Sequence, residues 1–357
     1  MIDKEYFVTY NNGSNESSFV VSSSRCFFLD PLNEYEPGGL LYVESVITTV
    51  INLVGAIIAI WGNGIILLTF WKSGQLRSQS HLFLWCLAFA DFLTGLIGQP
   101  FYGAYKIALL SGHASSSCLY RVIFETVAWF SAALSCALVS SIVGDRYLAL
   151  HFHLRYHVVV TTKKVAFLIM YLVITMAILS LSRFATTTVT PFLYVNILGL
   201  LSSFFMLSIC YWKIFKQVLR HFRKIQDQAF TESQTIDMQR FKKSVINMAY
   251  VAFLYMISYM PFTCVLFVYL SCGFTRNVEV AYDITRTLAF MNSSWNPFIY
   301  FWRVEELREA VRKTLRWAHW LNTPRMWTFR LKVNIYSGAP NENIVQKHSN
   351  IALLNVF

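Results

Sequence analysis

The chain has 357 residues, of which 55% are hydrophobic and only 14% are charged, against roughly 25% charged residues in soluble domains. This composition excludes an ordinary soluble domain and indicates a membrane protein. The formal net charge of +11 could suggest nucleic-acid binding, but the basic residues fall in short clusters between long apolar segments, so we exclude nucleic acid as a partner.

Seven segments are long and apolar enough to cross a bilayer, which takes roughly 20 residues. The fourth is barely long enough, because Ser180, Ser182 and Arg183 interrupt its end. An amphipathic stretch at 304–317 then follows, and it is either a helix on the membrane surface or an ordinary solvated helix. We therefore expect an all-α membrane protein, a seven-transmembrane helix bundle with a short amphipathic helix after the seventh span. The expected spans are about 44–71, 80–105, 119–147, 164–183, 192–218, 244–270 and 281–302.

The lysines and arginines predict the orientation of the bundle. With the amino terminus outside, 23 of the 30 fall on the cytoplasmic side, as the positive-inside rule requires. Residues 1–43 then form an extracellular arm, 44–303 the bundle and 304–357 the amphipathic helix and cytoplasmic tail. Glycosylation sequons at Asn12 and Asn15 agree with an outer arm. We expect a multi-pass protein of the plasma membrane whose first span acts as an uncleaved anchor, because no cleavable signal precedes it.

Polar side chains lie at membrane depth in three of the spans. Asp91 lies roughly two and a half turns inside the second span, and an ionisable residue there is a functional candidate. Carboxylate, hydroxyl and amide oxygens are the ligands that small hard cations prefer, although any one Ser or Asn could instead hydrogen-bond to a neighbouring helix. The oxygen-bearing side chains at this depth are Asp91, Ser131, Ser135, Asn292, Ser293 and Asn296.

The third span ends in the sequence GDRY, where an acid and an arginine are adjacent after a long uncharged run. Buried charges are costly, so we expect Asp145 and Arg146 to pair with each other or with a neighbouring span. The alternative is an arginine that reaches past the helix end to the membrane surface.

Taken in chain order, these motifs resemble those of the rhodopsin-like (class A) G-protein-coupled receptors, over about residues 50–317. Within that family, the stretch from Asp145 onward is most similar to the group of melanocortin, adenosine and cannabinoid receptors. The signatures that carry the resemblance are Gly62-Asn63, LAFAD with Asp91, DRY at Asp145 to Tyr147, Pro261, and NPFIY at Asn296 to Tyr300.

The resemblance implies a receptor that binds an extracellular ligand and activates a heterotrimeric G protein. Arg146 would be held by Asp145 at rest and released on activation, with Tyr211 and Tyr300 moving toward it. The G-protein switch would comprise Asp145, Arg146, Tyr147, Tyr211, Asn296, Pro297 and Tyr300. A sodium ion that favours the inactive state would be the one modulator, with no other metal or cofactor, held by Asp91, Ser135, Asn292, Ser293 and Asn296.

The ligand class follows partly from departures from the family pattern. Opsins carry a lysine where this chain has Phe290, which excludes retinal, and amine receptors carry an aspartate where this chain has Ala128, so we expect no biogenic amine held in that way. Glu125 could contact ligand or could pair with Arg121 one turn away. A largely apolar wall suits a lipid, a small amphipathic molecule or a peptide's apolar anchor. The expected pocket residues are Glu125, Ala128, Trp129, Tyr259 and Arg286.

Three cysteines, Cys26, Cys118 and Cys272, fall outside the membrane, where disulfides persist, and the residues leave all three pairings open. Similarity to melanocortin receptors favours Cys26 with Cys272. We expect no enzyme, because Asp145 and Asp283 lie near opposite membrane faces and cannot form an aspartyl-protease pair. A channel or transporter subunit is the alternative to a receptor, although the sequence shows no internal repeat.

We predict measurable ligand-free signalling. Many family members hold the counterpart of Arg146 a second time, with an acid at the position of Phe241, which here lies beside three basic residues. A charge-assisted hydrogen bond is worth about 1–2 kcal/mol, so Phe241→Glu should lower ligand-free cyclic AMP signalling about fivefold to thirtyfold. A parent chain that is silent although well expressed at the cell surface would contradict the prediction.

Overall fold

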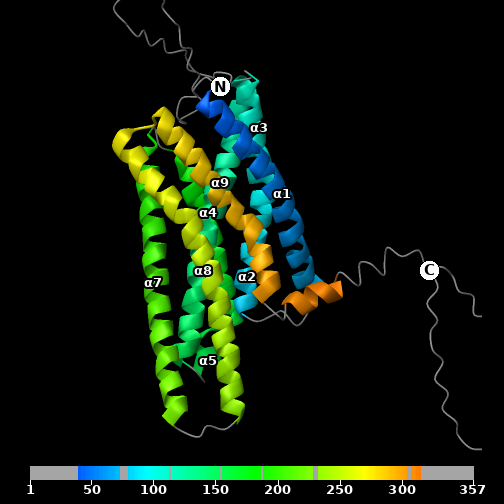
Figure 1. Cartoon of the computed structure of the whole chain (residues 1–357), viewed down its shortest axis with the longest axis vertical. Coiled ribbons are helices and arrows are strands. Elements are labelled where there is room, and N and C mark those ends of the chain that lie inside the picture. The colour runs from blue at the N-terminus through cyan, green and yellow to red at the C-terminus, as the bar shows by residue number, and fades with distance from the viewer. Residues whose placement is uncertain are drawn as a thin grey trace, which may run out of the picture.

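The computed structural model describes residues 39–72, 79–111, 114–152, 155–185, 188–227, 232–303 and 307–314. Long helices in this part of the chain lie side by side in one elongated bundle (Figure 1). The sequons, Cys26 and most of the tail lie outside the described residues. The helices are α1 (Leu40–Lys72), α2 (Gln79–Leu93), α3 (Gln99–Leu110), α4 (Ala114–Phe152), α5 (Tyr156–Val159), α6 (Thr162–Leu181), α7 (Thr190–Asp227), α8 (Glu232–Cys272) and α9 (Arg276–Arg303).

The expected all-α seven-helix bundle is confirmed. Six helical segments are long and apolar enough to cross a membrane: α1, α2 with α3, α4, α6, α7 and α8. The fourth span is not marginal, because α6 is continued by a 3-10 turn, Ser182–Phe184, and is the most hydrophobic of the six. The seventh helix, α9, has 28 residues but mixes charged and polar side chains with apolar ones.

The second span contains a change of helix type that its sequence pattern does not predict. Between α2 and α3 the backbone widens into one π-helical turn, Thr94–Gly98, immediately before Pro100. Proline has no backbone N–H to donate, and a π turn is a common way to absorb such a break without ending the helix. The turn directs Thr94 into the interior of the bundle.

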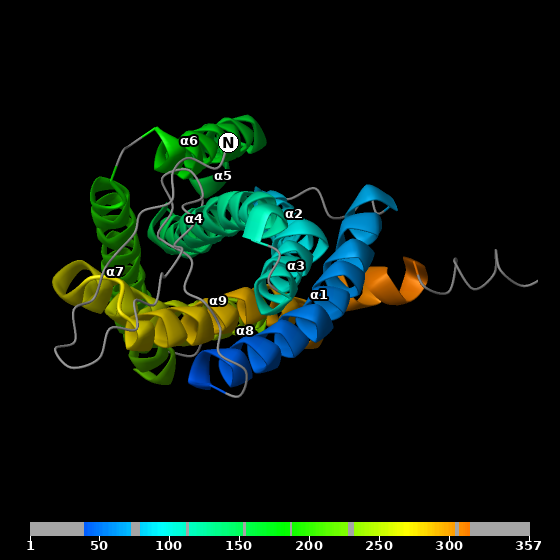
Figure 2. The ribbon, with the colours of Figure 1, turned by 90° about the horizontal axis from the view of Figure 1, so that it is seen from above.

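Helix α4 occupies the interior of the bundle and packs against α2, α3, α6, α7 and α8 (Figure 2). It therefore contributes side chains to both cavities described below and to the pair of Asp145 and Arg146. Helices α7 and α8 extend beyond the other helices at one end of the bundle (Figure 1). By the predicted orientation, that end is cytoplasmic.

Polar side chains join α1 to α9 along their length. The Asn52 amide donates to the Thr287 hydroxyl at 2.9 Å, and the Asn63 amide donates to the backbone carbonyl of Ser293 at 3.0 Å. Both asparagines are fully buried. Interhelical hydrogen bonds of this kind hold membrane helices in register, because the lipid offers no competing partner.

The described part of the amphipathic stretch, 307–314, is a helix that lies crosswise to the bundle axis beside the lower end of α1 and leads away from the bundle (Figure 1). Its apolar residues Leu307 and Val311 are buried and belong to the main hydrophobic core. This contact contradicts the alternative of an ordinary solvated helix.

The contact between Gly62 on α1 and Pro297 on α9 generates a stability prediction. A Cβ atom at Gly62 would lie 2.7 Å from the Cβ and Cγ atoms of the rigid proline ring, so Gly62→Ala must push the helices apart. We expect a loss of about 1–3 kcal/mol, measured as a lower melting temperature of the purified protein.

The matched control is Gly199→Ala on α7, where an added Cβ meets nothing within 4 Å. Alanine is the better helix former by about 0.5–1 kcal/mol, so this variant should melt at the parent temperature or above it. Equal melting temperatures for the two variants would contradict the predicted clash.

Candidate functional site

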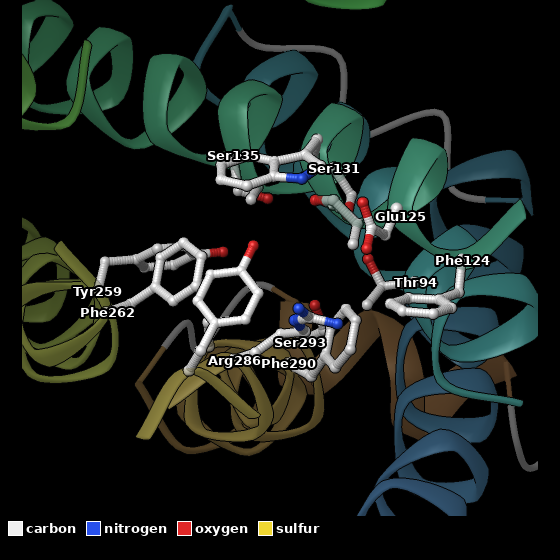
Figure 3. A pocket seen from close by; sticks show the side chains of 15 residues that line it. Thr94, Phe124, Glu125, Ser131, Ser135, Tyr259, Phe262, Arg286, Phe290 and Ser293 are labelled. Atoms are coloured by element: carbon white, nitrogen blue, oxygen red, sulfur yellow. Dashed lines mark hydrogen bonds between the residues drawn. The ribbon is translucent and has the colours of Figure 1, made fainter. Parts of the chain in front are cut away.

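A narrow cavity lies between α4, α8, α9 and the π turn (Figure 3). Its volume is about 30 Å³, which is room for one or two water molecules. A ligand of ordinary size therefore requires these helices to separate. The structure brings all five expected pocket residues to the wall of this cavity: Glu125, Ala128, Trp129, Tyr259 and Arg286.

Arg286 points into the cavity from α9 and is surrounded mainly by aromatic rings (Figure 3). Its guanidinium carbon lies 4.2 Å from the ring centre of Tyr282 and 5.2 Å from that of Phe124. The nearest carboxylate oxygen is that of Asp283, at 3.6 Å from Nη1. Cation–π contact stabilises a desolvated guanidinium while leaving its N–H groups able to donate to a further partner.

Glu125 pairs with Arg121, the alternative to a ligand contact that the sequence left open. Arg121 Nε donates to Glu125 Oε1 at 3.1 Å, one turn away on α4, and both side chains are about 7% exposed. The carboxylate still faces the cavity, but its charge is already compensated by Arg121. A ligand cation would have to compete with this buried pair.

The structure reveals a buried ion-pair network that sequence reasoning missed. Lys106 on α3 is completely buried, and its ammonium contacts Glu44 of α1 at 3.4 Å and Asp283 of α9. It also donates to the Ser45 hydroxyl at 3.1 Å. We call Glu44, Lys106 and Asp283 the outer triad. It joins three helices through one positive and two negative side chains.

A signal for the outer triad was present in the sequence. The expected second span ended at residue 105, which placed Lys106 in a loop. The actual α3 continues to Leu110, so the lysine lies inside the helix. Glu44 and Asp283 likewise lie within α1 and α9. Opposite charges at corresponding depths of three spans would have predicted the contact.

Asp91 lies one hydrogen bond beyond the cavity wall, behind Ser293, and is completely buried. It accepts hydrogen bonds from Ser293 Oγ and from Asn296 Nδ2, both at 2.8 Å. Ser135 and Ser293 also line the cavity wall, so the cavity reaches this cluster. The side-chain oxygen of Asn292 is buried and has no hydrogen-bond partner among the described residues. The five predicted sodium ligands are thus all buried, but direct contacts are recorded only among Asp91, Ser293 and Asn296.

The acid and the arginine of the DRY motif form an ion pair, with Arg146 Nη2 2.7 Å from Asp145 Oδ2. Tyr156 of α5 donates its hydroxyl to the other carboxylate oxygen at 2.5 Å. Burial and this hydrogen bond raise the pKa of the Tyr156 hydroxyl well above its usual value, so the hydroxyl stays protonated as a donor. Sequence reasoning did not identify Tyr156.

The other switch residues lie as follows. Tyr211 and Tyr300 have buried hydroxyls without a hydrogen-bond partner in the described chain. Tyr147 is half-buried, and the Lys213 ammonium lies 5.3 Å from its ring centre. Pro297 interrupts the hydrogen bonds of α9 beside Asn296. The side chain of Phe241 lies outside the described residues.

The predicted disulfide between Cys26 and Cys272 is wrong. Cys272 is a free, exposed cysteine at the end of α8, whereas Cys118, near the start of α4, is disulfide-bonded. The partner of Cys118 lies outside the described residues. Similarity to one receptor subgroup was therefore a poor guide to this pairing.

Comparison with known proteins identifies a family. The model of the 7 transmembrane receptor (rhodopsin family) matches residues 62–192 and 183–300. The histamine H2 receptor of Cavia porcellus is 27% identical over 76% of this chain and 80% of its own length. The human C-C chemokine receptor type 9 is 22% identical over 74% of each chain, and the adenosine receptor A2a of Canis lupus familiaris is 25% identical over 74% and 71%.

The outer triad generates a stability prediction. Lys106→Met leaves the Glu44 carboxylate buried without a cation among the described residues and leaves Asp283 with the 3.6 Å contact to Arg286; a buried charge that loses its partner typically costs about 3–5 kcal/mol. We expect a markedly lower melting temperature and little protein at the cell surface. Lys163→Met, at an exposed position, should leave both unchanged.

Neutralising the acids as well tests the reason for this loss. The triple variant Glu44→Gln, Lys106→Met, Asp283→Asn should regain much of the lost stability, because no buried carboxylate remains uncompensated and Arg286 keeps its cation–π contacts with aromatic rings. A triple variant as unstable as Lys106→Met would show that packing, not charge, explains the effect.

Proposed function

Because the chain belongs to the rhodopsin family of seven-transmembrane receptors, we propose that it binds an extracellular ligand in the central cavity and activates a G protein through Arg146. Membership of this family makes it a ligand-binding G-protein-coupled receptor and decides against both an enzyme and the channel or transporter alternative. The observation that carries the proposal is the ion pair of Asp145 and Arg146, which Tyr156 reinforces.

The ion pair would keep Arg146 from the G protein at rest. Two contacts position the Asp145 carboxylate, one from Arg146 and one from Tyr156, so the arginine is held by an acid that is itself fixed. The Arg146 side chain is 17% exposed, and its Nε atom has no partner among the described residues. A modest gain in free energy elsewhere in the protein could therefore release Arg146 from Asp145.

Ligand binding would supply that gain by shifting the population of states. The narrow cavity must widen to admit a ligand, and its walls belong to α4, α8 and α9. These helices also carry Arg146 on α4 and Tyr300 on α9. The buried, unbonded hydroxyls of Tyr211 and Tyr300 would gain partners if Arg146 or water entered the space between them.

A sodium ion beside Asp91 would favour the resting state. The carboxylate, the Ser135 hydroxyl and the unbonded oxygen of Asn292 are hard oxygen donors of the kind that small cations prefer. Among the described residues, Asp91 has no cationic side-chain partner, and its hydrogen bonds come from the neutral donors Ser293 and Asn296. A cation would supply the missing charge and, by linkage, would weaken agonist binding.

The cavity favours a ligand with an apolar body and a hydrogen-bond acceptor. Because histamine H2 receptors are among the relatives, an amine is a second candidate for the ligand. Glu125 is the one acidic side chain among the described residues of the wall, however, and Arg121 compensates it, whereas Arg286 faces the cavity. We propose that Arg286 meets an acceptor or anionic group of the ligand. With Phe290 at the lysine position of opsins, we propose no retinal.

We propose that the protein lies in the plasma membrane with its amino terminus outside. The positive-inside count supports this orientation. It places the outer triad and Arg286 toward the extracellular side and the DRY pair toward the cytoplasm, as the proposed mechanism requires.

Guanine-nucleotide exchange in membranes that carry the receptor tests the proposed function. We expect ligand-free exchange above that of empty membranes, and we expect Asp145→Asn to raise it several-fold because the Arg146 contact weakens. Arg146→Ala should abolish it, while Lys163→Ala should match the parent. Exchange that is identical in all variants and in empty membranes, with the proteins at the cell surface, would overturn the proposal.

A second prediction concerns sodium. If the Asp91 cluster binds the ion, replacing sodium by a large organic cation should raise ligand-free exchange in the parent. Asp91→Asn should remove that difference, because it removes the anionic ligand. Ser131→Ala, a change at a neighbouring hydroxyl that bonds its own helix backbone, is the matched control and should keep it. Identical sodium responses in Asp91→Asn and the parent would contradict the site.

A further inference from the structure

A second, larger cavity lies between α4, α6 and α7. Its volume is about 390 Å³, within the range of ordinary small-molecule sites, whereas the central cavity measures about 30 Å³. Four of its wall residues also line the central cavity and separate the two spaces: Trp129, Ala132, Tyr259 and Phe262. We call it the lateral cavity.

Small side chains create the lateral cavity. On α4, the positions that face it include Ala132, Ala133 and Ala137, at the spacing of one helical face. On α7, the facing position is Gly199, where an added Cβ would meet nothing within 4 Å. The helices therefore leave a space that larger side chains could have filled without a clash.

The lateral cavity opens toward the hydrocarbon of the membrane. Its rim on α7 consists of the exposed residues Val195, Gly199, Ser202 and Met206, which form one stripe of that helix. This stretch of α7 is part of an apolar segment that is long enough to cross a bilayer. The molecules that surround the opening are therefore lipids, and a lipid can enter without crossing the extracellular face.

The chemistry of the wall excludes charged occupants. None of the nineteen described residues that line the lateral cavity is charged. The polar groups are neutral: the Ser140 and Ser203 hydroxyls lie 2.7 Å apart, and the Asn196 amide donates to the backbone of its own helix at 2.8 Å. A carboxylate or phosphate here would lose its hydration without gaining a cation. The hydroxyl and amide oxygens of the wall can instead accept a hydrogen bond from a neutral hydroxyl group of the occupant.

We propose that the lateral cavity is a binding site for a neutral single-chain lipid with a hydroxylated head group, taken up from the bilayer. The apolar wall would hold the chain, and Ser140, Ser203 or Asn196 would hydrogen-bond the head group. A second copy of this chain fits less well, because the cavity is concave and its floor, at Trp129, Cys136 and Leu200, is buried. The site is distinct from the central cavity, whose wall carries Arg286 and Glu125.

Photolabelling of the full-length receptor in lipid nanodiscs tests the proposal. The probe is a monoacylglycerol with a diazirine in its acyl chain, and the comparison probe is the corresponding fatty acid, which differs in carrying a negative charge. Mass spectrometry then locates the adducts. We expect the monoacylglycerol to label segments 172–179 and 195–206, and we expect the fatty acid to label them at least about tenfold less.

Gly199→Leu is the decisive variant. Gly199 lies on the exposed rim of the cavity, so the new side chain would narrow the opening through which the lipid enters, and the open space around Gly199 lets the variant fold. Labelling of both segments should fall about tenfold or more, while Leu198→Phe, a change at an exposed neighbour outside the wall, should label like the parent. Labelling that is unchanged in Gly199→Leu, or equal for both probes, or replaced by cross-links between two copies of the chain, would overturn the proposal. None of these outcomes depends on G-protein activation.

Discussion

The architecture of the outer half depends on one buried cation. Lys106 has no exposed surface, and an ammonium in such a place is tolerable only if anions compensate it. Glu44 and Asp283 do so from the two neighbouring helices, so α1, α3 and α9 must lie within reach of one atom. Asp283 in turn lies near Arg286, which faces the central cavity. The position of the cavity's cation thus follows from the position of the lysine.

Below the outer triad, polar contacts between helices recur at successive depths of the bundle. Asn52 of α1 meets Thr287 of α9, then Asp91 of α2 meets Ser293 and Asn296 of α9, and Asp145 of α4 meets Tyr156 of α5 near the cytoplasmic end. Each contact restrains helices that apolar side chains alone would leave free to slide. The cavity opens into this series at Ser135 and Ser293. A ligand can therefore act on contacts that it never touches.

The features that the sequence predicted are those marked by a pattern within one short stretch of residues. The DRY motif places an acid beside an arginine, and such neighbours can pair in any helix. Asp91 was identified because a carboxylate inside an apolar span is costly wherever its partners lie. The family resemblance then located the second helix that reaches it. The helix count followed from the length of the apolar segments, and the expected pocket wall followed from the same resemblance.

Other features depend on where separate helices meet, which no local pattern records. Lys106 was missed because the expected span ended at residue 105, five residues before the end of α3, and its partners are 62 and 177 residues away in the chain. The free Cys272 shows the same limit for disulfides, because pairing requires two ends to coincide in space. The π turn at Thr94–Gly98 leaves hydropathy unchanged, and the lateral cavity is a property of three surfaces at once.

The unequal lengths of the helices have a mechanical consequence. Helix α8 begins at Glu232, 29 residues before Pro261, where the missing N–H removes one backbone hydrogen bond. At 1.5 Å per residue, that arm is about 44 Å long. A tilt of about 10° at the proline would therefore displace its far end by about 8 Å, although the side chains beside the cavity had hardly moved. Under the proposed mechanism, α8 would convert a small movement beside the ligand into a large displacement that a protein partner can recognise.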